Sequence, residues 1–335
     1  MYKIIFFGTS ELAVPSLKAL MQDGRFEIAG VVTQPDRPVG RHATITPPPV
    51  KQFLIEKNTI IRHPEITEAS YANTTVIFQP EKLSDPTFQS WLKEVGPTCD
   101  AFVIVSYGKI LPQWVLDLPK QGIINLHPSL LPLHRGPTPI QAAIAAGDRV
   151  TGVSIMKIDT GMDHGPILAW SNELIEPTDT GTTLHGRLAE IGASLLVPTL
   201  DAYLNGDIEP TEQDHAKASF CGILSRENGK IDWDKRAEEI ERLVRAYDPW
   251  PGTWTEVEGK RVKIFSTRIR ESSIPSLLAT QPQRAVTPGT RYVLDGLPCI
   301  MCGDKASLII TELQVEGKER VKGEEFVRGK QKWGN

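Results

Sequence analysis

The regular alternation of short apolar runs and helix-like segments in the first half of the chain is the feature that most constrains its fold. Five runs rich in Ile, Val and Phe have the length of buried strands, at 3–8, 26–34, 74–79, 100–108 and 122–127. Segments such as ELAVPSLKALMQDG and PTFQSWLKEVG separate them and have a helical pattern. The alternation predicts an α/β fold with a doubly wound, mostly parallel, Rossmann-like sheet, in which ligands bind beyond the carboxyl ends of the strands.

The second half of the chain has a different pattern. Two further strands surround a glycine-punctuated loop in TGVSIMKIDTGMDHGPILAW, and a long helix and a polar stretch follow. Short alternating strands with glycine turns then predict a small C-terminal β-barrel of OB-like topology. We therefore expect a Rossmann-like domain at 1–206, a linker at 207–219 and a β-barrel domain at 220–335.

Composition disfavours several classes of protein. The chain has 335 residues, of which 40% are hydrophobic and 23% charged, as in ordinary globular proteins. It has no apolar run of the roughly 18 residues that span a bilayer and begins with no cleavable signal, so we expect a cytoplasmic protein that binds no membrane. The four cysteines are scattered, and the lone pair Cys299 and Cys302 has no further ligands nearby, which predicts neither disulfides nor a metal site.

Charge is distributed unevenly along the chain. The net charge is −4, but the residues after His215 include 21 Lys and Arg against 17 Asp and Glu, while the preceding residues include 16 against 24. A basic second part joined to an acidic first part is expected if only the second part meets a polyanion.

Two polar side chains stand at the end of the apolar run 122–127, directly before Pro128. Asn125 and His127 are two positions apart and therefore share one face of the predicted strand. A carboxamide and an imidazolium side by side form a pair of donors suited to a developing oxyanion. A carboxylate nearby would stabilise the imidazolium. Asp159 and Asp163 in the downstream loop are both candidates, and spacing alone does not choose between them.

Two common nucleotide-binding patterns are missing. Gly8 ends the first strand and opens a helix, but the GxGxxG fingerprint of dinucleotide-binding proteins needs further glycines there. A P-loop is also missing from the sequence. Hydride transfer and nucleotide hydrolysis are therefore disfavoured.

The motifs around these residues resemble those of a known family. NLHPSLLP, RGPTPIQ and DTGMDHGPIL are similar to the signature of enzymes that transfer a formyl group from 10-formyltetrahydrofolate. TQPDRPVGR, SYGKILP and GKIDWDKRAEEIERLVRAYDPWPGTW narrow the resemblance to the methionyl-tRNA formyltransferases, over most of the chain. The resemblance implies formyl transfer to the α-amino group of methionyl-initiator tRNA by a monomer, with 10-formyltetrahydrofolate as co-substrate and no metal.

The resemblance also implies which residues act. It gives a catalytic trio of Asn125, His127 and Asp163, which chooses between the two aspartates. It places the tetrahydrofolate against Ser129, Leu130, Leu131 and Pro132, with a pterin pocket lined by Tyr107, Lys109, Ile110 and Leu111.

Two regions are expected to contact the tRNA. The stretch 34–51 is too polar and proline-rich for a strand or helix, and the resemblance implies a loop against the acceptor stem. Its main contact would be Arg41, with Arg37 and Lys51 adding phosphate contacts. In the C-terminal domain the expected phosphate-binding surface consists of Lys260, Arg261, Lys263, Arg268 and Arg270.

The sequence departs from the family pattern in three places. Family members commonly have lysines after the arginine that matches Arg41, but this sequence has RHATI there. Pro128 stands where glycine or alanine is common, and an insertion occupies 59–73.

Two alternative functions stay open. A formyltransferase for an amino-sugar nucleotide would keep the trio but has less need of the 34–51 loop or a basic barrel. A folate-binding or RNA-binding protein without turnover is the alternative from another class.

Overall fold

The computed structural model describes residues 1–40, 43–57, 61–62, 75–270, 287–329 and 333. The chain divides into two compact units. The first contains Met1–Pro139, Val150–Leu174 and His185–Cys221, and the second contains Ile140–Arg149, Ile175–Leu184 and Gly222–Asn335. No helix among the described residues is both long enough and apolar enough to cross a membrane.

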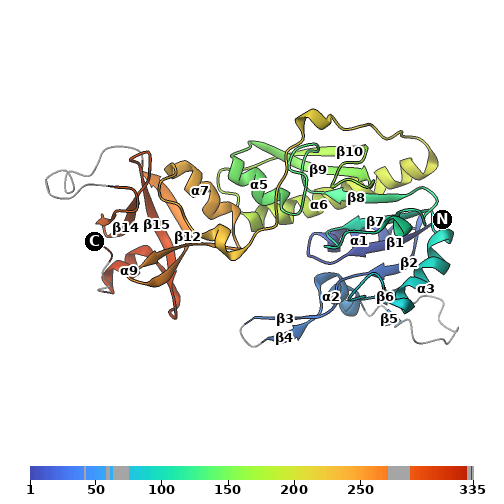
Figure 1. Cartoon of the computed structure of the whole chain (residues 1–335), viewed down its shortest axis with the longest axis horizontal. Coiled ribbons are helices and arrows are strands. Elements are labelled where there is room, and N and C mark those ends of the chain that lie inside the picture. The colour runs from blue at the N-terminus through green and yellow to red at the C-terminus, as the bar shows by residue number, and fades with distance from the viewer. Residues whose placement is uncertain (41–42, 58–60, 63–74, 271–286, 330–332, 334–335) are drawn as a thin grey trace. The chain divides into compact units, whose positions relative to one another are not determined.

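The first unit is built on an eight-stranded sheet with the order β10-β9-β8-β7-β1-β2-β6-β5 (Figure 1). The strands are β1 (Tyr2–Gly8), β2 (Phe26–Val32), β5 (Ile61–Arg62), β6 (Thr75–Phe78), β7 (Ala101–Val105), β8 (Ile123–His127), β9 (Val150–Lys157) and β10 (Ile167–Leu174). All neighbours pair in parallel except β8–β9 and β9–β10, which are antiparallel. The predicted doubly wound, mostly parallel sheet is confirmed. Strand order reverses between β1 and β7, where such folds bind ligands.

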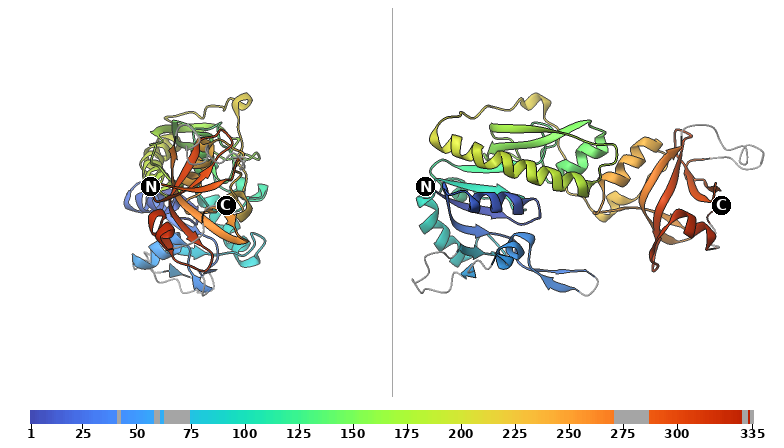
Figure 2. Two further views of the ribbon diagram at one scale, coloured as in Figure 1. Left: turned by 90° about the vertical axis from the view of Figure 1, so that its left-hand side faces the viewer. Right: turned by 180° about the vertical axis from the view of Figure 1, so that it is seen from behind.

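Helices cover both faces of this sheet. They are α1 (Ala13–Gln22), α2 (Pro49–Glu56), α3 (Pro86–Val95), α4 (Gln113–Leu116) and α6 (Gly181–Asn205). Helix α5 (Pro139–Ala146) follows β8 in the chain, and all its residues but the first belong to the second unit. The long helix α6 lies along one face (Figure 2), where a Cβ on Gly192 would come within 2.6 Å of Leu126 Cδ1 in β8. Because strand side chains alternate, Asn125 and His127 point to the opposite face from Leu126.

The stretch 34–51 differs from its prediction as a loop without strands. Its described residues form a hairpin of β3 (Arg37–Val39) and β4 (Thr44–Thr46), in which Val39 pairs with Thr44. The hairpin extends away from α2 (Figure 1). The prediction gave too little weight to the β-branched residues of β4, and Pro38 is tolerated because both strands of a two-stranded ribbon are edges.

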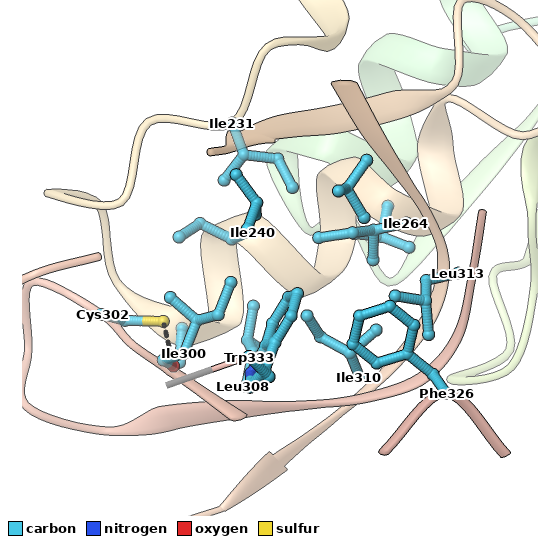
Figure 3. Close-up of a cluster of buried hydrophobic side chains, with 14 of the residues drawn as sticks. Ile231, Ile240, Ile264, Ile300, Cys302, Leu308, Ile310, Leu313, Phe326 and Trp333 are labelled. Carbon is cyan, nitrogen blue, oxygen red and sulfur yellow. Dashed lines mark hydrogen bonds between the residues drawn. The ribbon is translucent and has the colours of Figure 1, made fainter. Parts of the chain in front are cut away.

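The second unit contains an antiparallel sheet with the order β11-β12-β15-β14-β13, and β16 pairs with β15. Its elements are α7 (Ala237–Ala246), β11 (Thr253–Val257), β12 (Lys260–Arg270), β13 (Arg291–Leu294), β14 (Leu297–Met301), β15 (Ser307–Val315), β16 (Arg320–Lys322) and α9 (Gly323–Arg328). Figure 3 shows the apolar core, where Ile240 of α7 lies among Ile264, Leu308 and Ile310. The prediction for this part of the chain was a small β-barrel of OB-like topology, and its antiparallel sheet is confirmed.

The segment predicted as a linker, 207–219, packs on the first unit. Thr211 exchanges two main-chain hydrogen bonds with Ile167 at the start of β10, of 2.8 and 2.7 Å. Ser219 accepts a hydrogen bond from the amide of Arg135 at 2.8 Å. The predicted domain boundaries stay predictions, but this segment is bound along its length rather than free.

Candidate functional site

The carboxyl end of β8 places two buried polar side chains on one face of the sheet. Asn125 and His127 are 9% and 4% exposed. They lie between β7 and β9, where Asn125 pairs with Ile104 on one side and Met156 on the other. The antiparallel strand β9 holds the backbone of both residues, and parallel pairing with β7 also holds that of Asn125. The predicted juxtaposition at the strand end is therefore observed.

The ring of His127 has a protein group at each nitrogen. Nε2–H donates to the carbonyl of His134 at 3.0 Å, and Nδ1 lies 3.6 Å from Asp163 Oδ2. The second distance is too long for a hydrogen bond but short enough for an ion pair when the ring is charged. Since both nitrogens are engaged, the ring can donate to a substrate oxygen only if one of these contacts changes, as active sites without substrate often require.

The structure separates the two aspartates that spacing could not. Asp163 Oδ2 accepts a hydrogen bond from the amide of Gly136 at 2.7 Å, which keeps the carboxylate beside His127. Asp159 instead lies 2.6 Å from His164 Nδ1 and accepts from the amide of Gly161. The residue beside His127 is therefore Asp163, the aspartate that the resemblance implied.

The segment expected to hold the folate is fixed from within. Ser129 Oγ donates to the carbonyl of Leu133 at 2.6 Å. Ser154 of β9 donates to the carbonyl of Ser129 at 2.7 Å and accepts from the amide of Leu131 at 3.1 Å. The Leu131–Pro132 peptide bond is cis. The three hydrogen bonds hold residues 129–132 directly after the two buried donors.

The residues expected to line a pterin pocket have different environments. The Tyr107 ring is buried in the core and packs edge-on against Phe7, and its carbonyl accepts a hydrogen bond from Thr9. Lys109 donates to the carbonyls of Pro80 and Glu81, and burial lowers its pKa. Among the other two, Leu111 is half-buried and Ile110 is exposed. The segment lies beside the carboxyl end of β7, but its lining of a pocket stays a prediction.

Two of the three residues of the 34–51 stretch that are expected to contact tRNA lie within the described residues, and both form ion pairs. Arg41 lies outside the described residues. Arg37 is exposed and paired with Glu81 at 2.7 Å. Lys51 Nζ contacts both oxygens of Asp36 at 2.9 Å and is only 21% exposed, so it supports the hairpin base from inside.

The basic residues expected on the C-terminal domain lie along β12. Lys260, Arg261, Lys263 and Arg268 are exposed, and Arg270 is half-buried. The Arg261 guanidinium lies 4.2 Å over the ring of Trp254 on the neighbouring strand, a cation–π contact. Opposite Trp254 in the register stands Lys263. These cations therefore share one strand and are in part oriented by an aromatic ring beneath them.

Sequence reasoning missed four residues that support the site. Ser154 pairs with His127 in the register and is a buried polar residue between the apolar residues Val153 and Ile155, a pattern that could have marked it. Arg135 is the first residue of the RGPTPIQ motif, but the sequence analysis assigned it no role. Gln213 and Ser219 lie in the segment predicted as a linker, where nothing in the sequence distinguishes a buried residue from a solvated one.

The described part of the chain contains no cluster of His, Cys, Asp or Glu that could hold a metal ion. Cys299 and Cys302 are buried and free, and burial raises their pKa values to about 11 and about 12. Their environment is that of core thiols, which are inert.

Two family models match the chain. Residues 2–200 match the formyl transferase family, and residues 223–331 match the formyl transferase C-terminal domain. Solved structures with the same fold include an N-formyltransferase from Helicobacter canadensis in complex with folinic acid and dTDP-3-aminofucose, at TM-score 0.64 and 18% identity over 92% of this chain and 99% of that one. HypX from Aquifex aeolicus in complex with tetrahydrofolic acid matches at TM-score 0.57 and 17% identity, over 97% of this chain and 47% of that one.

Fold, site and family models together define a formyltransferase. Relatives that match nearly the whole chain sharpen this assignment. A methionyl-tRNA formyltransferase from Acidobacterium capsulatum is 41% identical over 98% of this chain and 96% of its own length, and one from Chloroflexus aurantiacus is 40% identical over the same shares. The chain belongs to the methionyl-tRNA formyltransferase family.

Proposed function

We propose that the chain transfers the formyl group of 10-formyltetrahydrofolate to the α-amino group of methionyl-initiator tRNA. The observation that most supports this activity is the meeting of Asn125, His127 and Asp163 at the carboxyl edge of the sheet. Full-length similarity to methionyl-tRNA formyltransferases supports the choice of acceptor.

The reaction is a direct acyl transfer. The lone pair of the amine forms a bond to the formyl carbon, and the carbonyl electron pair moves onto oxygen to give a tetrahedral oxyanion. When the oxyanion collapses, the bond to folate N10 breaks, N10 takes a proton and the amine loses one. Neither a redox step nor a covalent enzyme intermediate is needed for this balance.

The residues at the strand end suit the charge that develops. The amide of Asn125 and the imidazolium of His127 would donate to the oxyanion, and buried donors of this type contribute about 3 kcal/mol each. The Asp163 carboxylate, 3.6 Å from Nδ1, stabilises positive charge on the ring. Holding the amine beside the carbonyl supplies much of the remaining rate enhancement.

The substrate contacts follow from the same proposal. The turn of Ser129, Leu130, Leu131 and Pro132 would hold the folate, with 107–111 beside it. Arg37 of the hairpin, Arg41 and the exposed cations of β12 would bind tRNA phosphates. Lys51 would support the hairpin base. Because its acceptor is an aminoacyl-tRNA, we propose a cytoplasmic enzyme, and by resemblance to the family a monomer.

A substrate comparison tests the proposal. The purified chain is incubated with 10-formyltetrahydrofolate and either methionyl-initiator tRNA or a dTDP-linked amino sugar, the acceptor class in the Helicobacter canadensis complex. We expect formylation of the aminoacyl-tRNA. Transfer to the amino sugar alone would show that the acceptor is an amino sugar and not methionyl-tRNA. If neither acceptor is formylated, the proposed formyl transfer is wrong.

A further inference from the structure

Behind Asp163 lies a pair of buried polar side chains that no step of the reaction uses. Arg135 is 3% exposed and follows the folate turn, and Gln213 is 5% exposed and lies in the segment predicted as a linker. Arg135 Nη2 and Nε donate to Gln213 Oε1 at 2.6 and 3.2 Å. These two side chains connect three segments that are distant in sequence: the turn at 134–136, the loop of Asp163 and the 207–219 segment.

Gln213 binds the backbone of the Asp163 loop at two points. Its Nε2 donates to the carbonyl of Asp163 at 2.9 Å and to that of Gly165 at 2.7 Å. Asp163 has φ +46°, in the left-handed region that residues other than glycine seldom adopt. Such a conformation persists only where surrounding contacts hold it. Gln213 supplies two of those contacts.

Arg135 fixes which way the Gln213 carboxamide points. If the carboxamide turned over, its N–H donors would meet the guanidinium, which is itself a donor only, and its oxygen would meet two carbonyl oxygens. The donors of Gln213 are therefore directed at the Asp163 loop by the charge on Arg135. Arg135 Nη2 also lies 2.8 Å from His215 Nδ1, which accepts the hydrogen bond because a guanidinium can only donate.

The backbone on either side of Arg135 touches the catalytic residues. The carbonyl of His134 accepts from His127 Nε2, and the amide of Gly136 donates to Asp163 Oδ2. The turn at 134–136 and the Asp163 loop are thus joined twice, once directly and once through Arg135 and Gln213. A shift of either side chain would alter the 3.6 Å contact between His127 and Asp163.

Among the described residues, the buried charge of Arg135 has no carboxylate partner. Over the described ranges no Asp or Glu forms an ion pair with it, and its side-chain acceptors are Gln213 and His215. Burying a guanidinium against neutral partners is unfavourable compared with an apolar pair. Two buried apolar side chains could fill this space but could not orient donors toward Asp163.

We propose that Arg135 and Gln213 are positioning residues that set the geometry of the His127–Asp163 pair, so that the 207–219 segment is part of the active site. This inference rests on the proposed formyl transfer. It predicts that loss of the two Gln213 donors slows the chemical step, because Asp163 is displaced, without weakening the binding of either substrate.

The variant Gln213→Glu separates the two halves of the network. Its carboxylate keeps the acceptor for Arg135 and gains an ion pair, so folding is supported, but it has no donor for the carbonyls of Asp163 and Gly165. We expect kcat for formyl transfer to fall about 10- to 100-fold, as small misplacements of catalytic groups do. KM for methionyl-tRNA and for the folate should change by less than about twofold.

A double-mutant cycle with Asp163→Asn distinguishes positioning from general support. If Gln213 acts through the carboxylate, Gln213→Glu should reduce the single-turnover rate by less than about twofold once that carboxylate is gone. The control is Gln121→Glu, which removes a carboxamide bond to the carbonyl of Leu204 near the amino end of β8. Its kcat should equal that of the unchanged chain.

The results test the positioning role and the proposed formyl transfer separately. Full kcat in Gln213→Glu, or the same loss with and without the Asp163 carboxylate, would overturn the positioning role. Absence of transfer by the unchanged chain would overturn the proposed function, and the inference with it. If Gln213→Glu does not fold, Arg135→Lys takes its place in the cycle, because lysine keeps the charge but not the two-pronged bond.

Discussion

The carboxyl edge of β8 and the exposed face of β12 are both rich in polar side chains, but they are held in opposite ways. At β8, Asn125 and His127 are almost fully buried, and the ring of His127 has a neighbour at each nitrogen. On β12, Lys260 and Lys263 extend into solvent, and the contact of Arg261 is with an aromatic face.

The difference indicates what each region can do. Buried donors have one geometry, which suits the charge distribution of a single transition state. Exposed cations on long side chains can adapt to phosphates at varying positions, which suits a polyanion whose sequence is not read. Substitutions at β8 should therefore change kcat, and substitutions on β12 should change KM for tRNA and its dependence on salt.

The largest effect is expected at His127. His127→Ala removes one oxyanion donor and the partner of Asp163, and should lower kcat about 10²- to 10³-fold. Steady-state kinetics should show KM for methionyl-tRNA within about twofold of the unchanged chain. A loss of tRNA affinity as large as the loss in kcat would show that the β8 edge also binds the acceptor. The two regions would then not differ in function as proposed.

The next effect concerns the packing beneath β8. Gly192→Ala would place a Cβ 2.6 Å from Leu126 Cδ1, and overpacking of this kind should lower the free energy of unfolding by about 1–3 kcal/mol. Gly186→Ala on the same helix is the matched control, because its Cβ would meet no atom within 4 Å. Urea denaturation should show the control unchanged or slightly stabilised, since alanine favours helix. Equal stabilities would contradict the tight contact.

A smaller effect is expected on β12. Lys263→Ala should raise KM for tRNA a few-fold and reduce the slope of log affinity against log salt by about 1, with kcat unchanged. Lys18→Ala, an exposed lysine on α1, is the control and should leave both quantities unchanged. If the two variants behave alike, the expected phosphate surface lies elsewhere.

The smallest effect is electrostatic and depends on pH. The hydrogen bond from Arg320, at 2.7 Å, lowers the pKa of Glu312 below its usual value of 4.5. Stability from a lowered carboxyl pKa is present above the unfolded value and is lost as the pH falls through the folded value. Glu312→Gln should therefore be less stable at pH 7 by under about 1 kcal/mol, as for other surface pairs. Urea unfolding at successively lower pH below 4.5 should show this difference shrink, and a difference that grows as the pH falls would contradict the sign.

Much of the first unit could be predicted because its strands are buried on both faces. Such strands appear as continuous apolar runs. Strands β7 and β8 fall within the predicted ranges, and β1 begins one residue before its range. The two polar positions at the end of β8 stand out against that background for the same reason. The hairpin β3–β4 was missed because a short two-sided ribbon has no apolar run to reveal it.

The support of the site was not predictable in the same way. Arg135 and Gln213 are 78 residues apart, and their meeting depends on a segment whose composition resembles a solvated connector. Spacing along the sequence does not choose between Asp159 and Asp163 as the neighbour of His127. In the folded loop, Asp163 has a left-handed backbone conformation and lies beside the ring.

The sequence by itself determined the alternation of the long buried strands and helices, the pair Asn125 and His127 on one strand face, and the division into an acidic first part and a basic second part. These follow from local periodicity and composition, which need no knowledge of the fold. Only the tertiary structure decided which aspartate lies beside His127 and which residues hold it. Those outcomes depend on hydrogen bonds between segments distant in sequence, whose partners are chosen by burial and by geometry once the chain has folded.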